Sequence, residues 1–182
     1  MSQTLDLSDA ELAKWLVSTS LLTGQFRLRS GASSSTYFDK FRFCADPALL
    51  SCLVQRLKNL VFAETEVLAG LELGGVPLAT ALSLETGHPA AFVRKVRKTY
   101  GSARIVEGAD VPARRVCVIE DIVTTGGQIV SSVEALRAEG AIILGVLCVV
   151  NRGPRMNEAL AAAGIDFRWV FHLDDLVPWM PL

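Results

Sequence analysis

The chain has 182 residues, of which 51% are hydrophobic and 20% are charged, and its formal net charge is −1. These values suit a single folded domain with a sizeable buried core, and they exclude a disordered chain. They also exclude the strongly basic balance that is typical of a nucleic-acid-binding domain, so we expect no nucleic-acid partner.

The sequence carries no sign of a membrane span or an export signal. It has no apolar run of about 18 residues, the length that crosses a bilayer, and Met1–Ala10 lacks the basic start and apolar stretch of a signal peptide. None of the four cysteines forms a C-x-x-C pair; they are Cys44, Cys52, Cys117 and Cys148. Reduced thiols are therefore a better interpretation than a disulfide framework or a zinc site, and we expect a cytoplasmic protein.

The N-terminal part of the chain predicts a helix followed by two short strands. Ser8 and Glu11 have the spacing of a capping box, and the helical unit that they open should end at Gly24. Phe26–Leu28 and Thr36–Phe38 are interpreted as strands on either side of a turn of small residues.

From Asp46 onward, helical patterns alternate with short apolar runs. Asp46–Pro47 predicts a helix start. The apolar runs are Val67–Leu71, Ala90–Val93, Val116–Ile119 and Ile142–Val150, and helical patterns cover Val76–Glu85 and Gln128–Glu139. Apolar strands separated by helices predict an α/β fold with a central, mainly parallel sheet flanked by helices. Ligands of such a sheet bind at the carboxyl ends of its strands.

The stretch Val116–Gln128 carries the most informative motif. An apolar strand leads into two acids, and a Thr-Thr-Gly-Gly sequence then opens a helix; the residues from the acids onward are Glu120, Asp121, Ile122, Val123, Thr124, Thr125, Gly126, Gly127 and Gln128. Backbone N–H groups at a helix N-terminus, with glycines that let an anion approach, form a phosphate cradle. Carboxylates beside the cradle would repel a bare phosphate but accept hydrogen bonds from hydroxyls, so the motif predicts a sugar phosphate as ligand.

Two other phosphate motifs are excluded. In G-x-x-x-x-G-K-[ST] a Lys is required where this chain has Val76 after Gly70 and Gly75, and no G-x-G-x-x-G occurs. An ordinary strand–helix turn with exposed acids would be the better interpretation of a lone Gly-Gly pair. The full order of residues from strand to helix favours a phosphate site.

The stretch resembles the signature with which type I phosphoribosyltransferases bind 5-phosphoribosyl 1-pyrophosphate (PRPP). The resemblance implies that Thr124–Gln128 hold the 5-phosphate and that Glu120 and Asp121 contact the ribose hydroxyls, with Ile122 and Val123 completing the PRPP site. It also implies a pyrophosphate-binding loop at Leu71–Pro77, where several members carry a Lys and this chain has Gly74.

A basic segment follows the predicted strand Ala90–Val93. Its cations are Arg94, Lys95, Arg97, Lys98 and Arg104, and no acid appears before Glu107. Such a loop is a candidate pyrophosphate clamp, because its charges offset those that the leaving group gains. A solvated cationic turn is the alternative interpretation. The position of the loop between two predicted strands, in a sheet that already carries a phosphate cradle, favours the clamp.

Arg94–Gly101 resembles the catalytic loop of orotate phosphoribosyltransferases, a branch of the same family. The resemblance implies that Arg94, Lys95 and Lys98 bind pyrophosphate, and that Lys98 is the principal catalytic cation alongside Glu120 and Asp121. It also implies a homodimer in which this loop reaches into the partner's site.

The remaining matches concern the base. Phe26–Gly31 and Tyr37–Asp39 resemble the orotate region of that branch, which implies that Arg29, Tyr37 and Phe38 line the base site; plain core aromatics of a hairpin are the alternative.

Arg152 follows the last apolar run. An Arg at the end of a buried strand can pair bidentately with a planar carboxylate such as that of orotate. The resemblance implies this pairing, with Thr124 also touching the base.

The resemblance thus implies a type I phosphoribosyltransferase fold over residues 1–182 as a single domain, with about 1–45 and the C-terminal tail forming a hood. It implies transfer of ribose 5-phosphate from PRPP to orotate in UMP synthesis, with Mg²⁺ held mainly by PRPP. Two alternatives stay open: a purine or uracil phosphoribosyltransferase, and a PRPP-binding regulator without catalysis.

Overall fold

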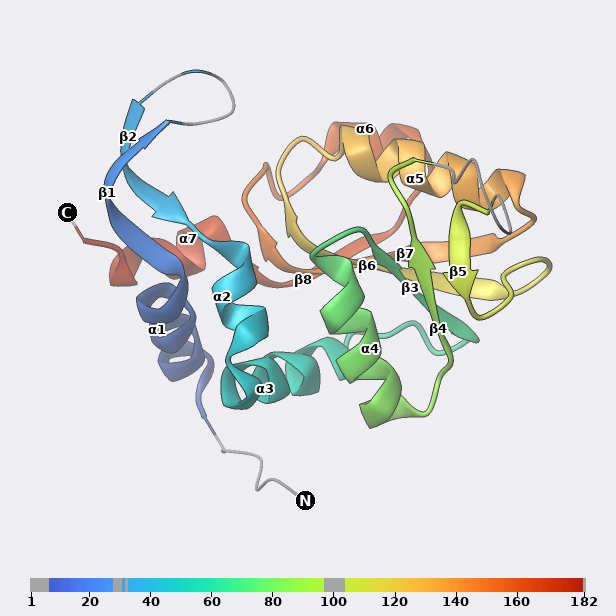
Figure 1. The fold of residues 1–182 in the computed structure, drawn as a ribbon, viewed down its shortest axis with the longest axis horizontal. Helices are drawn as coiled ribbons and strands as arrows, with labels where there is room; N and C mark the ends of the chain where they lie inside the picture. The colour runs from blue at the N-terminus through green and yellow to red at the C-terminus, as the bar shows by residue number, and fades with distance from the viewer. Residues whose placement is uncertain (1–6, 28–30, 32, 97–103, 182) are drawn as a thin grey trace.

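The computed structural model describes residues 7–27, 31, 33–96 and 104–181. A six-stranded sheet with helices on both faces forms the larger part, and an N-terminal layer of helices and a two-stranded hairpin lies beside it (Figure 1). The mainly parallel α/β architecture that the sequence predicts is confirmed.

Helix α1 (Asp9–Ser20) begins with the predicted capping box, in which Glu11 N donates to Ser8 Oγ and Ser8 N donates to Glu11 Oε2. The helix ends earlier than the sequence predicts. Leu21 is already extended, and strand β1 (Leu21–Arg27) runs through Gly24. Strand β1 pairs antiparallel with β2 (Ser33–Phe38), so both strands are longer than predicted. Pairing between the strands overrides the local helix signal.

Two helices follow the hairpin. Helix α2 (Lys40–Ala45) was not predicted from the sequence, because six residues are too few for a periodic signal. Its N-cap is Asp39, whose side chain accepts a hydrogen bond from Phe41 N at 3.0 Å. Helix α3 (Pro47–Lys58) begins as predicted, with the Asp46 side chain as cap.

The large sheet has the strand order β5-β4-β3-β6-β7-β8. Its parallel strands are β3 (Val67–Leu71), β4 (Ala90–Val93), β6 (Arg115–Val123), β7 (Ile142–Asn151) and β8 (Phe167–His172), and β5 (Val106–Gly108) is an antiparallel edge. Strand β6 continues past the apolar run Val116–Ile119 and past the acids. Its pairing with β7 reaches Val123, so the acid pair lies within the strand and not at its end.

Two apolar clusters cover the two faces of the sheet. One joins α1, α3 and α4 (Gly75–Thr86) to residues such as Cys117 and Ile119 of β6. The other joins α5 (Gly127–Ala138) and α6 (Glu158–Ala162) to Val116 and Val118 of the same strand. This alternation along β6 is what a strand buried on both faces requires.

The chain ends in α7 (Leu173–Leu176) and η1 (Val177–Trp179), which contact α1. Leu176 is fully buried and Met180 packs on the same cluster as α1, so the described part of the tail packs on the core. Figure 1 shows α7 between the hairpin and the sheet. Among the described helices, none is long and apolar enough to cross a membrane.

Candidate active site

The acid pair lies near the carboxyl end of β6, in the centre of the sheet. Asp121 is fully buried, and its Oδ1 accepts a hydrogen bond from Ile122 N at 2.6 Å. Lys40 Nζ, from the start of α2, lies 2.9 Å from Asp121 Oδ2 and 3.2 Å from Oδ1. Glu120 is half-buried, and its Oε1 accepts from Asp121 N at 2.8 Å. The structure thus brings one cation from the N-terminal layer to the two predicted ribose acids.

Burial, followed by the negative charge of Asp121, raises the pKa of Glu120 from its ordinary 4.5 to about 8. The charge of Lys40 acts in the opposite direction. Hydroxyl groups of a ligand could donate hydrogen bonds to both carboxyl groups and so stabilise their negative charge, since each carboxylate oxygen accepts more than one hydrogen bond. The pair is therefore suited to a sugar rather than to a second anion.

The predicted phosphate cradle lies directly after the acids. Gly126 is the N-cap of α5 with φ at +77°, a conformation that favours glycine. Thr124, Thr125, Gly127 and Gln128 are exposed. The first N–H groups of a helix have no partner inside the helix. The segment therefore presents backbone and hydroxyl donors to solvent, as a phosphate site requires.

Asn157 supports this loop, and sequence reasoning missed it. Its side chain is buried, donates to the Thr124 carbonyl at 3.3 Å, and accepts from Leu160 N as the N-cap of α6. A Cβ on Gly126 would lie 2.8 Å from Asn157 Oδ1. The position of an Asn before a helix as short as α6 was the only signal in the sequence.

The loop that carries Arg152 is tied to the phosphate loop. Arg152 N donates to the Val123 carbonyl at 2.7 Å, and a Cβ on Gly153 would lie 2.1 Å from the Thr124 carbonyl oxygen. His172 is buried, and its Nε2 lies 2.9 Å from the Gly153 carbonyl oxygen. Arg152 itself is exposed.

A cavity of about 320 Å³ opens beside Arg152. Its walls come from the N-terminal layer, from the end of β7 and from the tail: Leu21, Ser34, Thr36, Tyr37, Phe38, Val150, Arg152, Leu173, Leu176, Val177 and Met180. Tyr37 is 44% exposed, so it is not the plain core aromatic that the alternative interpretation supposes. No motif in the sequence indicated that the tail would form part of the cavity wall.

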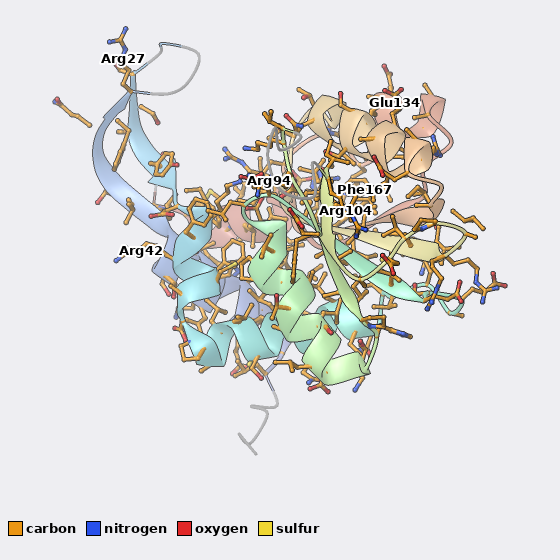
Figure 2. The ribbon with its side chains drawn as sticks, turned by 45° about the vertical axis from the view of Figure 1, so that its right-hand side comes forward. Arg27, Arg42, Arg94, Arg104, Glu134 and Phe167 are labelled. Carbon is orange, nitrogen blue, oxygen red and sulfur yellow. The ribbon has the colours of Figure 1, made fainter. Side chains whose placement is uncertain are left out.

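Residues of the two predicted pyrophosphate segments contact each other. Glu72 N donates to the Val93 carbonyl, and Lys95 N donates to Glu72 Oε2 at 3.0 Å. Arg94 is half-buried and Lys95 is exposed. Figure 2 shows Arg94 in the central part of the molecule, whereas Arg27 stands at the tip of the hairpin.

The other predicted pyrophosphate and base residues are placed as follows. Gly74 packs so closely on the acid pair that a Cβ there would lie 1.4 Å from Asp121 Oδ2. Lys98 and Arg29 lie outside the described residues.

Comparison with known proteins agrees with this geometry. The family described as phosphoribosyl transferase domain matches residues 51–175. The orotate phosphoribosyltransferase of a Nocardioides species is 47% identical over 160 residues, which cover 88% of this chain and 89% of that protein.

Solved structures give the same result. The orotate phosphoribosyltransferase of Mycobacterium tuberculosis in complex with Fe(III) dicitrate is similar with a TM-score of 0.81 at 35% identity, covering 92% of this chain and 98% of that one. The same enzyme in complex with PRPP gives a TM-score of 0.79 at 31% identity, covering 93% and 98%.

The chain therefore belongs to the phosphoribosyltransferase family, with the fold that the resemblance implied. Within that family its branch is that of the orotate phosphoribosyltransferases, which is the name of relatives that match most of its length.

Proposed function

We propose that this chain transfers ribose 5-phosphate from PRPP to orotate and yields orotidine 5′-phosphate and pyrophosphate, a step of UMP synthesis. The observation that carries the proposal is Arg152, exposed at the mouth of a largely apolar cavity of about 320 Å³ beside the phosphate loop. A planar guanidinium pairs bidentately with a carboxylate, and apolar walls accommodate a flat ring. A purine or uracil would leave Arg152 without a carboxylate partner.

The PRPP site that we propose runs along the carboxyl ends of β6 and β4. Thr124–Gln128 bind the 5-phosphate, and Glu120 and Asp121 accept hydrogen bonds from the ribose hydroxyls. Ile122 and Val123 complete this segment. The pyrophosphate is bound by Arg94, Lys95 and Lys98, and the base by Thr124, Arg152, Arg29, Tyr37 and Phe38.

In the proposed reaction, N1 of orotate forms a bond to C1 of the ribose while the bond from C1 to the pyrophosphate oxygen breaks. Bond breaking runs ahead, so positive charge develops at C1 and negative charge on the pyrophosphate. Lys98 is the principal cation that stabilises the leaving group, with Arg94 and Lys95 beside it. Glu120 and Asp121 orient the ribose through its hydroxyls.

We propose that the reaction uses Mg²⁺, held mainly by PRPP. Within the described ranges, no group of three or more His, Cys, Asp or Glu side chains is placed to hold a metal. Magnesium commonly binds through substrate phosphates and few protein ligands. When bound, the ion would offset charge on the pyrophosphate.

We also propose a homodimer in which the basic loop of one protomer completes the partner's site. Residues from about 1 to 45 and the tail would form a hood over the base in a single domain, which is supported by their shared lining of the cavity. The cytoplasm is the proposed compartment, because the four cysteines are free thiols, as is typical of reducing compartments.

The test is the loss of orotate absorbance on addition of PRPP and Mg²⁺, with adenine, hypoxanthine and uracil as parallel substrates. We expect turnover with orotate alone. Turnover with another base would contradict the assignment of Arg152, and PRPP binding without any turnover would favour the regulator.

A further inference from the structure

The contact between Lys40 and Asp121 joins the N-terminal layer to the centre of the sheet. The two residues are 81 positions apart in the chain, and Lys40 Nζ reaches both carboxylate oxygens of Asp121. The side chain of Asp121 is 1% exposed and that of Lys40 is 38% exposed. A buried carboxylate is thus paired with a lysine whose side chain is partly exposed.

The charge of Asp121 needs such a partner, because an unpaired buried carboxylate is strongly unfavourable. Gly74 is the residue of the Glu72–Gly75 segment that lies against Asp121. A basic side chain at this position could not pair with Asp121, because even a Cβ there would collide with the carboxylate. Burial alone would lower the pKa of Lys40, but the hydrogen bond and charge of Asp121 outweigh it and raise this pKa above 10.5. Lys40 therefore stays charged at neutral pH.

The segment around Lys40 also reaches the base cavity. Tyr37 and Phe38 line that cavity, and Asp39 caps the helix that Lys40 opens. Four consecutive residues thus run from the base cavity to the acid pair. An ammonium group has three N–H donors, and Lys40 Nζ lies 2.9 and 3.2 Å from the two oxygens of the Asp121 carboxylate.

We propose that Lys40 is a positioning residue for the transfer reaction, which holds the Asp121 carboxylate in place for the ribose of PRPP and ties the base cavity to the PRPP site. This inference rests on the proposed function. Without Lys40, the Asp121 carboxylate takes up a proton or turns away, so the ribose hydroxyls lose an acceptor. The affinity for PRPP therefore decreases more than the affinity for orotate.

The experiment compares Lys40→Met, which removes the charge, with Lys40→Arg, which keeps it. We expect Lys40→Met to raise both the KM and the calorimetric Kd for PRPP by about tenfold or more, with a smaller change in the KM for orotate. Lys40→Arg should recover most of this loss. Lys58→Met is the matched control, because Lys58 makes an exposed ion pair with Glu85 at the same 2.9 Å distance, away from the site.

A double-mutant cycle with Asp121→Asn tests whether Lys40 acts through Asp121. We expect Lys40→Met to have little further effect on PRPP affinity in the Asp121→Asn background. Independent, additive effects, or an unchanged PRPP affinity in Lys40→Met, would overturn the inference. If Lys40→Met does not fold, Lys40→Gln replaces it.

The wild-type assay separates this inference from the proposed function. An unmodified enzyme that turns over no base contradicts the function, while calorimetric PRPP binding still tests Lys40. A wild type that is active on orotate, with a Lys40→Met variant of equal PRPP affinity, contradicts only the inference.

Discussion

Asp121 lies near the end of β6 and Arg152 directly follows the neighbouring strand β7, but their surroundings are opposite. Asp121 is buried against Lys40, whereas Arg152 is exposed at the rim of the base cavity. A buried charge must be paired within the protein, while an exposed one stays available for a ligand. Substitutions at the acid pair should therefore affect both stability and activity, and a substitution at Arg152 should affect activity alone.

Arg152→Ala should raise the KM for orotate by about 10- to 100-fold, because it removes a charge-assisted hydrogen-bonded pair. The KM for PRPP and the melting temperature should change little. Steady-state kinetics with each substrate varied in turn measures this. Arg155→Ala is the control, since Arg155 is also exposed but faces Asp174 and Asp175 at 3.6 and 3.9 Å. An unchanged orotate KM in Arg152→Ala would contradict the base assignment.

The stability of the protein should fall with rising pH through the ionisation of Glu120. Folding raises the pKa of this carboxyl from 4.5 to about 8, so its contribution is fully present below pH 4.5 and is lost as the pH rises through 8. Within this window the slope is at most about 1.4 kcal/mol per pH unit.

Glu120→Gln cannot titrate, so its urea midpoint relative to wild type should rise from pH 5 to pH 8.5. Glu85→Gln serves as the control, because hydrogen bonds from Gln55 and Lys58 lower the pKa of Glu85 instead of raising it. Parallel curves for wild type and Glu120→Gln across this range would show that the carboxyl is not perturbed.

At the scale of elements, two short helices place supporting side chains at the site. Helices α2 and α6 have six and five residues, and each begins at a side-chain N-cap. Helix α2 brings Lys40 to Asp121, and the cap of α6 holds the carbonyl of Thr124. Such helices are stable only in their tertiary setting, because isolated helices of this length do not form.

Asn157→Ala should lower stability by about 1 kcal/mol through loss of the cap. It should also raise the KM for PRPP several-fold, since the Thr124 carbonyl in the phosphate loop loses the hydrogen bond that Asn157 donates. Ser8→Ala is the matched control: it removes the N-cap of α1, remote from the phosphate loop, and should lower stability alone. Equal effects of the two variants on PRPP kinetics would mean that Asn157 acts only as a cap.

At the scale of the whole molecule, the N-terminal layer and the tail share one core with the sheet. The larger apolar cluster contains Leu12 of α1, Phe43 of α2, Leu147 of β7 and Leu176 of α7. The walls of the base cavity therefore belong to the body of the protein and are positioned when it folds.

The proposed dimer predicts complementation between two variants that are each nearly inactive when orotate is at the wild-type KM. Lys98→Ala removes the proposed catalytic cation of the loop, and Arg152→Ala removes the proposed base contact. In a mixed dimer with shared loops, one site combines both intact parts. With PRPP saturating and orotate at the wild-type KM, co-refolded variants should therefore regain about a quarter of the activity that wild type shows under the same conditions. Failure to regain activity, with hybrid dimers verified by native mass spectrometry, would mean that each loop serves its own site.

The sequence by itself determined the features that depend on short-range pattern. Strands β3 and β4 lie at the predicted Val67–Leu71 and Ala90–Val93, since apolar runs between helices have few other places in a fold. The capping box of α1 and the order of acids, threonines and glycines before α5 were also local signals. These local signals were sufficient to predict the fold class and the family.

Only the tertiary structure decided the features that depend on contacts between distant residues. Pairing with β7 extended β6 beyond Ile119, and pairing with β2 extended β1 through Gly24. No motif indicated the edge strands β5 and β8. The same holds for the ion pair between Lys40 and Asp121 and for the part of the cavity wall that the tail forms. Strand pairing, charge burial and cavity shape are set by residues far apart in the chain, and a local pattern holds no information about which of them will meet.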